Sequence, residues 1–212
     1  MSSPIPEKTI ERLSEYRRTL LKCHAHGITH IFSHVLAGMH GITAVQVRRD
    51  LMLIGFSSDT KKGYDVKVLI DFIDSILYSE QPINMAVIGM GHLGRAVTRY
   101  FNGKGLKLRI TAAFDVDSAK VGTSIDGIPC YHIDEFEERV DELNISIVIV
   151  SSPTSVASTL VLPIINAGIK GVLNFTSAPL NFPPGIVVEN YDITTLLEKV
   201  AYFVKVAEES NN

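Results

Sequence analysis

Three glycines in a short stretch have the spacing of a diphosphate-binding loop. The stretch Gly89–Gly94 reads Gly-Met-Gly-His-Leu-Gly and follows a short uncharged apolar run, Met85–Ile88. The run predicts a buried strand of a parallel sheet, and the residues from Leu93 onward have helical periodicity. In such a strand–turn–helix the first glycine makes the tight turn, the second lets a pyrophosphate approach the backbone, and the third lets the helix pack closely. The diphosphate would accept hydrogen bonds from the first N–H groups of that helix. The predicted ligand contacts in this loop are Gly89, Met90, Gly91, His92, Leu93 and Gly94.

An acid lies where a dinucleotide site commonly has one. Asp115 ends a second predicted strand, Arg109–Asp115, about 20 residues past the last glycine, where a carboxylate usually binds the ribose 2′-hydroxyl. Because a carboxylate repels a 2′-phosphate and no basic residue follows Asp115 directly, the pattern favours NAD(H) over NADP(H). The alternative is a glycine-rich turn of an α/β domain that binds nothing.

The rest of the second half alternates strands and helices, which predicts a parallel Rossmann sheet. We expect strands over Ile128–Tyr131, Ile145–Val150, Gly171–Phe175 and Gly185–Val188, and helices over Asp134–Leu143 and Thr154–Ala167. Ligands of such sheets bind at the carboxyl ends of the strands. Two loops lie at that edge, Ser151-Ser152-Pro153 and Asn174-Phe175-Thr176. The first could place hydroxyls, with Ser151 as the predicted contact, and the second an amide and an aromatic ring, from Asn174 and Phe175, near a nicotinamide. Ordinary turn chemistry is the alternative for both loops.

The first half has the pattern of a helix-turn-helix. After a helix over Glu7–His26, Ser33 is a candidate N-cap for a short helix over His34–Met39, and Gly41 makes the turn. Thr43-Ala44-Val45-Gln46 is a capping-box pattern that opens a third helix, Ala44–Leu53. Gln can read adenine, whereas Arg can read guanine or bind phosphate. The predicted DNA contacts are Thr43, Gln46, Arg48, Arg49, Lys61 and Lys62.

The two lysines belong to a predicted wing, a polar hairpin over Phe56–Gly63. Asp65 then caps a fourth helix, Val66–Leu77, and a linker, Tyr78–Asn84, leads into the second half. The alternative is a plain helical bundle with scattered basic residues.

Histidines are concentrated in the same half, since five of the seven lie between His24 and His40. His26, His30 and His34 have the i,i+4 spacing of metal ligands on one helix. Gly27 interrupts that helix, and Cys23 alone adds a further ligand at matching spacing. We therefore predict no metal site, and solvated or DNA-facing histidines are the better interpretation.

Length and composition are those of a globular chain, and positive charge is concentrated in its N-terminal part, residues 1–64. The 212 residues are 46% hydrophobic and 20% charged, with a net charge of −3. Residues 1–64 carry a balance of +4 and residues 65–212 one of −7, which suggests that the N-terminal part meets a polyanion. There is no apolar run of about 18 residues and no signal-peptide pattern at the start, so we expect a cytoplasmic protein without a membrane partner.

A C-terminal helix over Asp192–Ala207 carries more apolar residues than one flank of a sheet needs. This surplus predicts packing against a partner subunit. A helix that closes its own domain is the alternative.

Taken together, nearly the whole chain resembles the redox-sensing transcriptional repressor Rex family of bacteria. The resemblance is carried by ordered stretches that include GITAVQVRRDL, NMAVIGMGHLGRAVTRY, AAFDVD, AGIKGVLNF and VVENYDITTLLEKVAYF. It implies a homodimer in which a winged helix binds palindromic operator DNA, a Rossmann domain binds NAD(H), and the C-terminal helix is exchanged between subunits. In that family high NADH releases the repressor from DNA.

The resemblance also assigns residues. It matches the glycine loop and Asp115 to the family's dinucleotide site, and Gln46, Arg48 and Arg49 to its recognition helix. Arg18, Tyr100 and Asp192 match positions that exchange hydrogen bonds between subunits as the ligand changes. Two departures concern the wing, which reads Ser57-Ser58-Asp59-Thr60 where the family is rich in Gly and Lys, and Pro179, which stands where a basic residue is common.

The predicted organisation is α/β in class, with a winged-helix DNA-binding domain at 1–80, a Rossmann domain at 81–190 and a dimerisation helix at 191–212. The predicted function is an NADH-responsive repressor without catalytic residues. One rival is a small NAD-dependent oxidoreductase, which would need an acid or base near the nicotinamide. His92 and His132 are poorly placed for that role. A second rival is a nucleotide sensor whose DNA binding is degraded, which the acid in the wing would explain.

Overall fold

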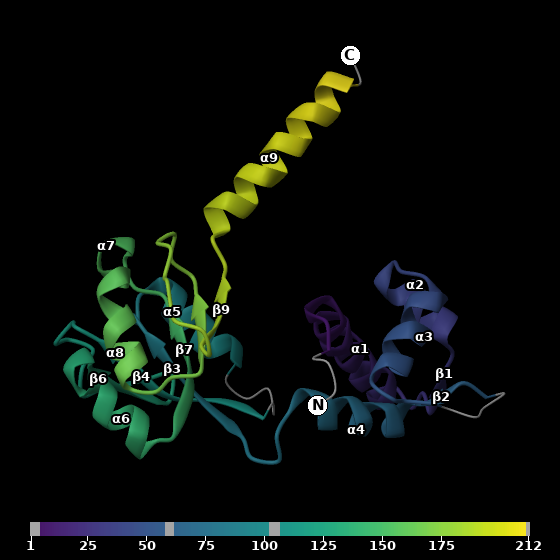
Figure 1. The fold of residues 1–212 in the computed structure, drawn as a ribbon, viewed down its shortest axis with the longest axis horizontal. Coiled ribbons are helices and arrows are strands. Elements are labelled where there is room, and N and C mark those ends of the chain that lie inside the picture. Colours follow the sequence, from purple (N-terminus) through teal and green to yellow (C-terminus); the bar gives the residue numbers. More distant parts are fainter. Residues whose placement is uncertain (1–4, 58–61, 102–106, 211–212) are drawn as a thin grey trace. The chain divides into compact units, whose positions relative to one another are not determined.

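The computed structural model of the chain describes residues 5–57, 62–101 and 107–210. The chain divides into two compact units, Met1–Gln81 and Pro82–Asn212 (Figure 1).

The N-terminal unit is built from helices around a small apolar core. Leu13 and Leu20 from the first helix, Leu51 from the third and Leu69 from the fourth are almost fully buried there. The two short strands pair antiparallel, with Ile31 opposite Tyr64, and so close the unit at the base of the predicted wing. The elements are α1 (Glu7–Ala25), β1 (His30–Ile31), α2 (Ser33–His40), α3 (Ala44–Leu53), β2 (Tyr64–Asp65) and α4 (Val66–Leu77).

Most of the predicted helix caps of this unit are confirmed. Gly41 ends α2 in the left-handed conformation with φ of 63°. The Thr43 hydroxyl accepts a hydrogen bond from Gln46 N at 3.1 Å, and the Asp65 carboxylate accepts one from Val68 N at 2.9 Å.

Two details of the predicted caps were wrong, one at α2 and one at α3. Ser33 is the first residue of α2 and not its N-cap, a position held by Phe32 without a side-chain bond. The Ser33 hydroxyl instead accepts from Arg48 Nη1 at 3.0 Å. The capping box at α3 is half formed, because the Gln46 side chain donates to Asp50 Oδ1 at 2.9 Å.

A seven-stranded sheet in the order β5-β6-β4-β3-β7-β8-β9 forms the second unit. All neighbours are parallel except β5 and β6, which pair antiparallel. Because β3 lies at the centre with β4 on one side and β7 on the other, the strand order reverses where the glycine loop leaves β3. The strands are β3 (Ile83–Ile88), β4 (Leu108–Asp115), β5 (Ser124–Ile125), β6 (Ile128–His132), β7 (Ile145–Val150), β8 (Gly171–Asn174) and β9 (Val187–Asn190).

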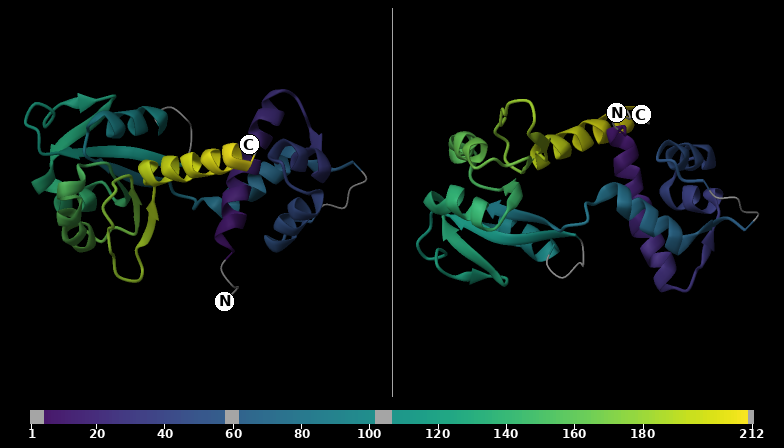
Figure 2. Two further views of the ribbon diagram at one scale, coloured as in Figure 1. Left: turned by 90° about the horizontal axis from the view of Figure 1, so that it is seen from above. Right: turned by 60° about the horizontal axis from the view of Figure 1, so that its bottom comes forward.

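Helices cover both faces of this sheet, as expected for a Rossmann fold (Figure 2). Ala86 and Ile88 on β3 point to the face covered by Phe136 and Ile164, whereas Val87 points to the face where Val97 packs. Because successive side chains of β3 point to opposite faces and both faces are buried, the strand has a continuous apolar sequence. The helices are α5 (His92–Phe101), η1 (Ile133–Glu135), α6 (Phe136–Glu142), α7 (Thr154–Ala157), η2 (Ser158–Leu160) and α8 (Val161–Asn166).

The structure corrects several predicted boundaries. The single helix expected over Thr154–Ala167 is three short pieces, and Pro163, which has no N–H to donate, lies in the last of them. The last strand runs over Val187–Asn190 instead of Gly185–Val188. The first strand already begins at Ile83, inside the predicted linker.

The C-terminal helix α9 (Ile193–Ser210) has no buried residue. Its exposed large apolar side chains are Ile193, Leu196, Leu197, Val200, Tyr202, Phe203, Val204 and Val206. The alternative that α9 closes its own domain therefore loses its support. Nowhere in the described ranges is a helix both long and apolar enough to cross a membrane.

Candidate functional site

The glycine loop between β3 and α5 has the geometry that its spacing predicts. Gly89 has φ of 94°, and a Cβ there would lie 2.7 Å from Ser152 N. A Cβ on Gly94 would lie 2.1 Å from Gly89 O, so this glycine is required for the close approach of helix and loop. A Cβ on Gly91 would meet no atom within 4 Å, so the backbone there faces open space. Gly91 is therefore the point where a diphosphate can reach the loop.

A cavity of about 980 Å³ opens at this loop. It lies at the carboxyl ends of β3, β4 and β7, where a doubly wound sheet binds ligands. Its walls include His92 and Leu93 from the start of α5, Asp115 from β4, and Ser151 and Ser152 after β7. His92 is exposed and Leu93 is half-buried, so both predicted loop residues face the cavity. The volume is that of a pocket for a nucleotide-sized ligand.

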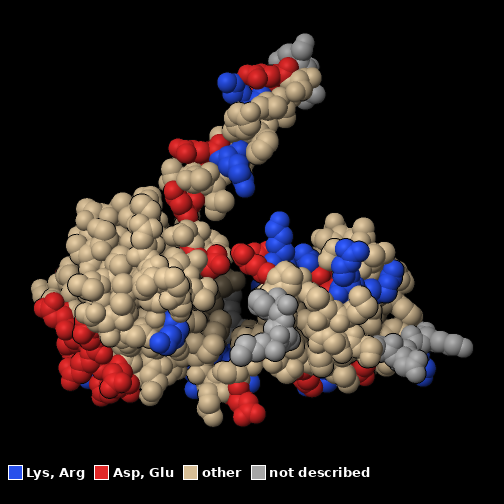
Figure 3. All heavy atoms as spheres, in the orientation of Figure 1, with Lys and Arg blue, Asp and Glu red and all other residues tan. Residues whose placement is uncertain are grey.

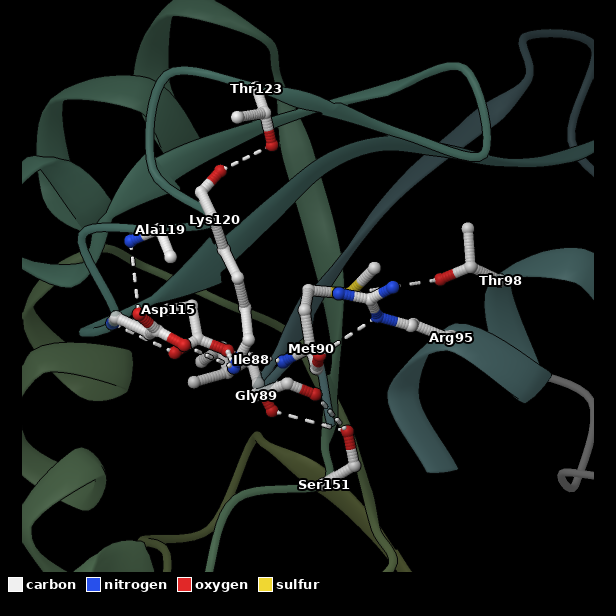
Figure 4. A network of polar contacts seen from close by, with 11 residues as sticks. Ile88, Gly89, Met90, Arg95, Thr98, Asp115, Ala119, Lys120, Thr123 and Ser151 are labelled. Atoms are coloured by element: carbon white, nitrogen blue, oxygen red, sulfur yellow. Dashed lines mark hydrogen bonds and ion pairs between the residues drawn. The ribbon is translucent and has the colours of Figure 1, made fainter. Parts of the chain in front are cut away.

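Asp115 is held at the mouth of the loop by three donors (Figure 4). Its Oδ2 accepts from Met90 N at 2.8 Å and lies 3.0 Å from Lys120 Nζ, and its Oδ1 accepts from Asp117 N at 3.0 Å. Burial raises the pKa of this carboxyl, but the three donors together hold the pKa below its usual range. The group is thus an ionised acceptor at neutral pH. Met90 contributes its backbone, because its side chain is fully buried under the loop.

Of the three residues predicted for the nicotinamide end, Ser151 lines the cavity, whereas Asn174 and Phe175 do not. Ser151 lines the cavity, but its hydroxyl donates to Gly89 O at 2.8 Å and thereby braces the turn. Asn174 is buried, and its amide donates to Ala178 O and to Asn190 Oδ1 at 2.9 Å each. Its Oδ1 accepts from Thr176. The Phe175 ring stacks on Tyr191 with ring centres 5.6 Å apart. The cavity is not lined by Asn174 or Phe175, so their contact with a ligand stays a prediction.

One cavity residue, Lys120, was missed from the sequence. Lys120 lies five positions after Asp115 and pairs with it. The prediction of cofactor preference considered only the position directly after Asp115. Ser152 has a buried Oγ that has no hydrogen-bond partner among the described residues. A buried hydroxyl without a partner is costly, and this one lines the cavity. The sequence offers both serines of this loop as hydroxyls. The structure separates them, because the Ser151 hydroxyl bonds Gly89 O and that of Ser152 does not.

The exposed face of α3 is the candidate nucleic-acid interface. Val45, Arg48, Arg49 and Met52 are all exposed and follow the i, i+3, i+4, i+7 spacing of one helix face. Lys62 is exposed as well, whereas Lys61 and most of the atypical wing sequence lie outside the described residues. Figure 3 shows Lys and Arg side chains on the visible face of the N-terminal unit, in contrast to the acids gathered over α6.

Gln46 does not share that exposed face, because it belongs to a buried cluster around Asp50. Arg12 binds both carboxylate oxygens of Asp50 at 2.7 Å, and the Tyr16 hydroxyl donates to Oδ2 at 2.8 Å. Gln46 Nε2 adds a bond at 2.9 Å. Burial raises the pKa of Asp50, yet the bonds from Arg12, Tyr16 and Gln46 bring it below its usual value. The cluster joins α1 to α3. The Gln46 side chain therefore helps to position α3 through Asp50, and the Thr43 hydroxyl does so by capping the helix.

The three predicted switch residues are on the surface of different elements. Arg18 on α1 donates to Ser14 Oγ at 3.3 Å. Tyr100 on α5 is 61% exposed, and its ring meets Phe101 edge-on. Asp192 accepts from Thr194 N at 3.0 Å and from Thr195 Oγ1 at 2.8 Å, and so caps α9. Since Arg18 belongs to the first unit and the other two to the second, their exchange remains a prediction.

In the described part of the chain, no three His, Cys, Asp or Glu side chains gather in a way that could hold a metal ion. Both cysteines, Cys23 and Cys130, are buried and free of disulfides.

Two protein-family models match the chain. A model described as "CoA binding domain" matches residues 80–178, and one described as "Putative DNA-binding protein N-terminus" matches residues 4–51.

Known proteins match over almost the full length. The redox-sensing transcriptional repressor Rex of Geobacillus kaustophilus is 38% identical over 201 residues, which are 95% of this chain and 94% of that protein. Rex of Leuconostoc citreum is 37% identical over 200 residues, which are 94% of this chain and 93% of that protein. The crystal structure of RSP in complex with beta-NAD+ and operator DNA superposes with a TM-score of 0.91 at 26% identity, and covers 99% of this chain and 97% of that one. A structure of RSP, a Rex-family repressor, has a TM-score of 0.83 and covers 98% of this chain and 97% of that one. This chain belongs to the Rex family of redox-sensing transcriptional repressors.

Proposed function

We propose that this protein is a transcriptional repressor that binds operator DNA through its N-terminal unit and is released from DNA when its second unit binds NADH. The observation that carries the proposal is the dinucleotide cavity at the Gly89–Gly94 loop, in a chain whose other unit presents a basic helix. The family membership supports it, because RSP has been crystallised with NADH and with NAD+ plus operator DNA.

The residues of the cavity fit a dinucleotide. The open backbone at Gly91 and the start of α5 would bind the diphosphate, and Asp115 would accept a hydrogen bond from the adenosine ribose. The unpartnered hydroxyl of Ser152 is a further candidate donor to the ligand. The nicotinamide end would lie toward Ser151 and, in our prediction, Asn174 and Phe175.

The ligand can act on DNA binding only through its different affinities for two states of the protein. NAD+ carries a positive nicotinamide ring and NADH a neutral one, and an apolar pocket disfavours the charged ring. We therefore infer that NADH binds more tightly than NAD+ and stabilises the state that does not bind DNA.

On the DNA side, Arg48 and Arg49 of α3 would enter the major groove or bind its phosphates. Lys61 and Lys62 would contact the flanking backbone. Thr43 and Gln46 would act mainly by positioning α3, since their side-chain bonds lie within the unit.

The active form would be a homodimer, because α9 exposes a continuous apolar surface that a second subunit could cover. We propose exchange of α9 between subunits and a cytoplasmic location where DNA is accessible. We assign no catalytic residue. His92 lines the cavity at the glycine loop, and the Lys120 ammonium pairs with two carboxylates, so neither is placed as a free acid or base at the nicotinamide.

A gel shift with promoter DNA from the protein's own genome tests the proposal. We expect a complex without ligand and with NAD+, and its loss at rising NADH, while an unrelated promoter binds weakly. An NADH-consumption assay run beside it should show no turnover. Steady consumption of NADH would instead support the oxidoreductase, and NADH binding without any DNA complex would support a sensor with degraded DNA binding.

A further inference from the structure

The ribose end of the cavity contains a cation as well as the acid. Lys120 Nζ lies 3.0 Å from Asp115 Oδ2 and 3.3 Å from Asp117 Oδ2, and all three residues line the cavity. The Lys120 side chain is 23% exposed and that of Asp115 is 9% exposed. The ammonium is thus more accessible than the Asp115 carboxylate, while the Asp117 side chain, at 46%, is more exposed than either.

A hydrogen-bonded turn holds this lysine in place. Asp117 O accepts from Lys120 N at 2.9 Å and from Val121 N at 3.1 Å, which closes one turn of chain after β4. Lys120 O in turn accepts from Thr123 Oγ1 at 2.6 Å. Because the backbone is tied on both sides, Lys120 projects toward Asp115 from a defined position (Figure 4).

Lys120 is the one Lys or Arg among the described residues that line the cavity. The remaining charged residues of the lining, Asp134 and Glu137, are acidic. Asp115, Asp117 and Lys120 together carry −1, whereas the two acids alone would carry −2. A phosphate at the adenosine 2′ position would therefore meet a neutralised Asp115 and an adjacent ammonium, which is a phosphate ligand.

We propose that Lys120 sets the selectivity of this site at the adenosine 2′ position, an inference that rests on the proposed dinucleotide site. Asp115 favours NADH through a hydrogen bond to the ribose hydroxyl. Lys120 weakens the repulsion that Asp115 exerts on a 2′-phosphate, so that NADPH is disfavoured much less than an isolated carboxylate would dictate. Selectivity for NADH is thus a balance between two side chains.

Calorimetric titration of the full-length protein with NADH and with NADPH tests this balance. The quantity to compare is the ratio of the two dissociation constants, NADPH over NADH, at low ionic strength, where charge effects are large. We expect Lys120→Met to raise this ratio about tenfold, because the acid is no longer neutralised. Lys120→Arg keeps the charge and should leave the ratio near that of the wild type.

Removing the acid should have the opposite effect. Asp115→Asn leaves Lys120 without its main partner, and this variant should bind NADPH more tightly than NADH by about tenfold. The double variant Asp115→Asn/Lys120→Met should show no such preference.

The proposal is overturned if the ratio in Lys120→Met stays within about threefold of the wild type. An Asp115→Asn variant that still prefers NADH overturns it equally. A wild-type protein that binds neither nucleotide would refute the dinucleotide site itself, so the two failures are distinguishable.

Discussion

At the scale of single residues, several polar side chains use their hydrogen bonds within the protein and so position the elements that carry the predicted contacts. Asp50 shows this most clearly. Its side chain is 2% exposed, and it accepts bonds from Arg12, Tyr16 and Gln46 that connect α1 with α3, the predicted recognition helix. A buried carboxylate that is fully paired fixes one arrangement of its partners, because any other arrangement leaves a charge unpaired.

We predict that Asp50→Asn destabilises the N-terminal unit by about 3 kcal/mol, since the partly buried Arg12 loses its charged partner. The effect should also depend on pH. The folded pKa of Asp50 lies below its unfolded value, so its stabilisation is present above the unfolded pKa of about 3.9 and is lost as pH falls through the folded value. Hydrogen exchange of the α3 amides, measured between neutral pH and about pH 3, should show the wild type losing protection at acid pH and approaching the variant.

The matched control is Asp71→Asn, which removes an exposed acid whose partner is Lys67 at 2.5 Å. Because both side chains are more than half exposed, this change should have little effect on exchange. Equal protection of α3 in Asp50→Asn and the wild type at neutral pH would contradict the role of the buried cluster.

The glycines allow a second test at this scale. Gly91→Ala adds a methyl group that meets no atom of the protein, so we expect unchanged thermal stability but NADH binding weakened at least tenfold, because the methyl occupies the approach of the diphosphate. Gly94→Ala places the same methyl 2.1 Å from Gly89 O and should lower the melting temperature as well. NADH binding at wild-type affinity by Gly91→Ala would place the diphosphate elsewhere.

At the scale of elements, the sequence was sufficient where a local rule decides the outcome. The caps at Thr43 and Asp65 give α3 and α4 the predicted bounds, and the apolar run Ile145–Val150 is the predicted central strand. The turn at Gly89 and the close packing at Gly94 are also as predicted, because a Cβ at either position would meet backbone. The role of Gly91 in admitting a diphosphate stays a prediction.

Prediction was incomplete where distant residues decide the outcome. Gln46 reads as the second half of a capping box, but Asp50 is buried against α1 and attracts its amide. Lys120 becomes part of the site only through a turn that folds it back on Asp115. The strand β5 exists because it pairs with β6. A strand of two residues is too short to have a hydrophobic periodicity that the sequence could reveal.

The recognition helix makes a prediction about DNA. If Arg49 reads a base, Arg49→Ala should cost about 1–3 kcal/mol on operator DNA and little on other sequences. If it binds phosphate, affinity should fall on all sequences and the slope of log K against log salt should decrease by about one. Fluorescence anisotropy over a salt series distinguishes the two.

Lys67→Ala provides the control, because it removes an exposed cation of the same unit that lies on α4. Unchanged DNA binding by an Arg48→Ala/Arg49→Ala variant would remove α3 from the interface.

The exposed apolar face of α9 predicts an oligomer. Val200→Glu places a charge among exposed apolar residues that include Leu197 and Val204, and it should convert a dimer into a monomer in analytical ultracentrifugation. Lys199→Glu introduces the same residue at the neighbouring polar position and should remain dimeric. A wild type that sediments as a monomer at micromolar concentration would exclude α9 as a strong dimerisation element.

At the scale of the whole molecule, the central question is how a ligand in one unit changes what the other unit binds. Moving a population from 1:99 to 99:1 takes about a 10⁴-fold preference of the ligand for one state. The glycine loop continues directly into α5, which carries Tyr100, and the sheet continues from β9 into α9 through Asp192. Both elements can therefore respond to a ligand at the carboxyl edge of the sheet, while Arg18 belongs to the DNA-binding unit.

We predict that Asp192 pairs with Arg18 in one state of the dimer and with Tyr100 in the other. In this structure the Asp192 carboxylate accepts from Thr194 N and from the Thr195 hydroxyl, and the Thr195 hydroxyl is the main cause that lowers the pKa of this carboxyl. The group is thus ionised at neutral pH and can serve either partner. Because one carboxylate cannot fully satisfy both, the ligand can bias the choice.

Tyr100→Phe tests this exchange, because it removes a hydroxyl while leaving the shape of the side chain. DNA binding without ligand should remain close to the wild type. The NADH concentration needed to release DNA should rise several-fold, because the NADH-bound state that does not bind DNA, in which we predict the Asp192–Tyr100 pair, loses a hydrogen bond to a charged group. The measurement is a release curve from operator DNA at increasing NADH, and direct NADH binding to the free protein serves as the control for the cavity. Tyr191→Phe provides a matched change in the same unit at a ring that stacks on Phe175, and it should leave the release curve in place. A Tyr100→Phe curve that overlays the wild type would reject the exchange and leave the repressor assignment standing on the DNA and NADH measurements.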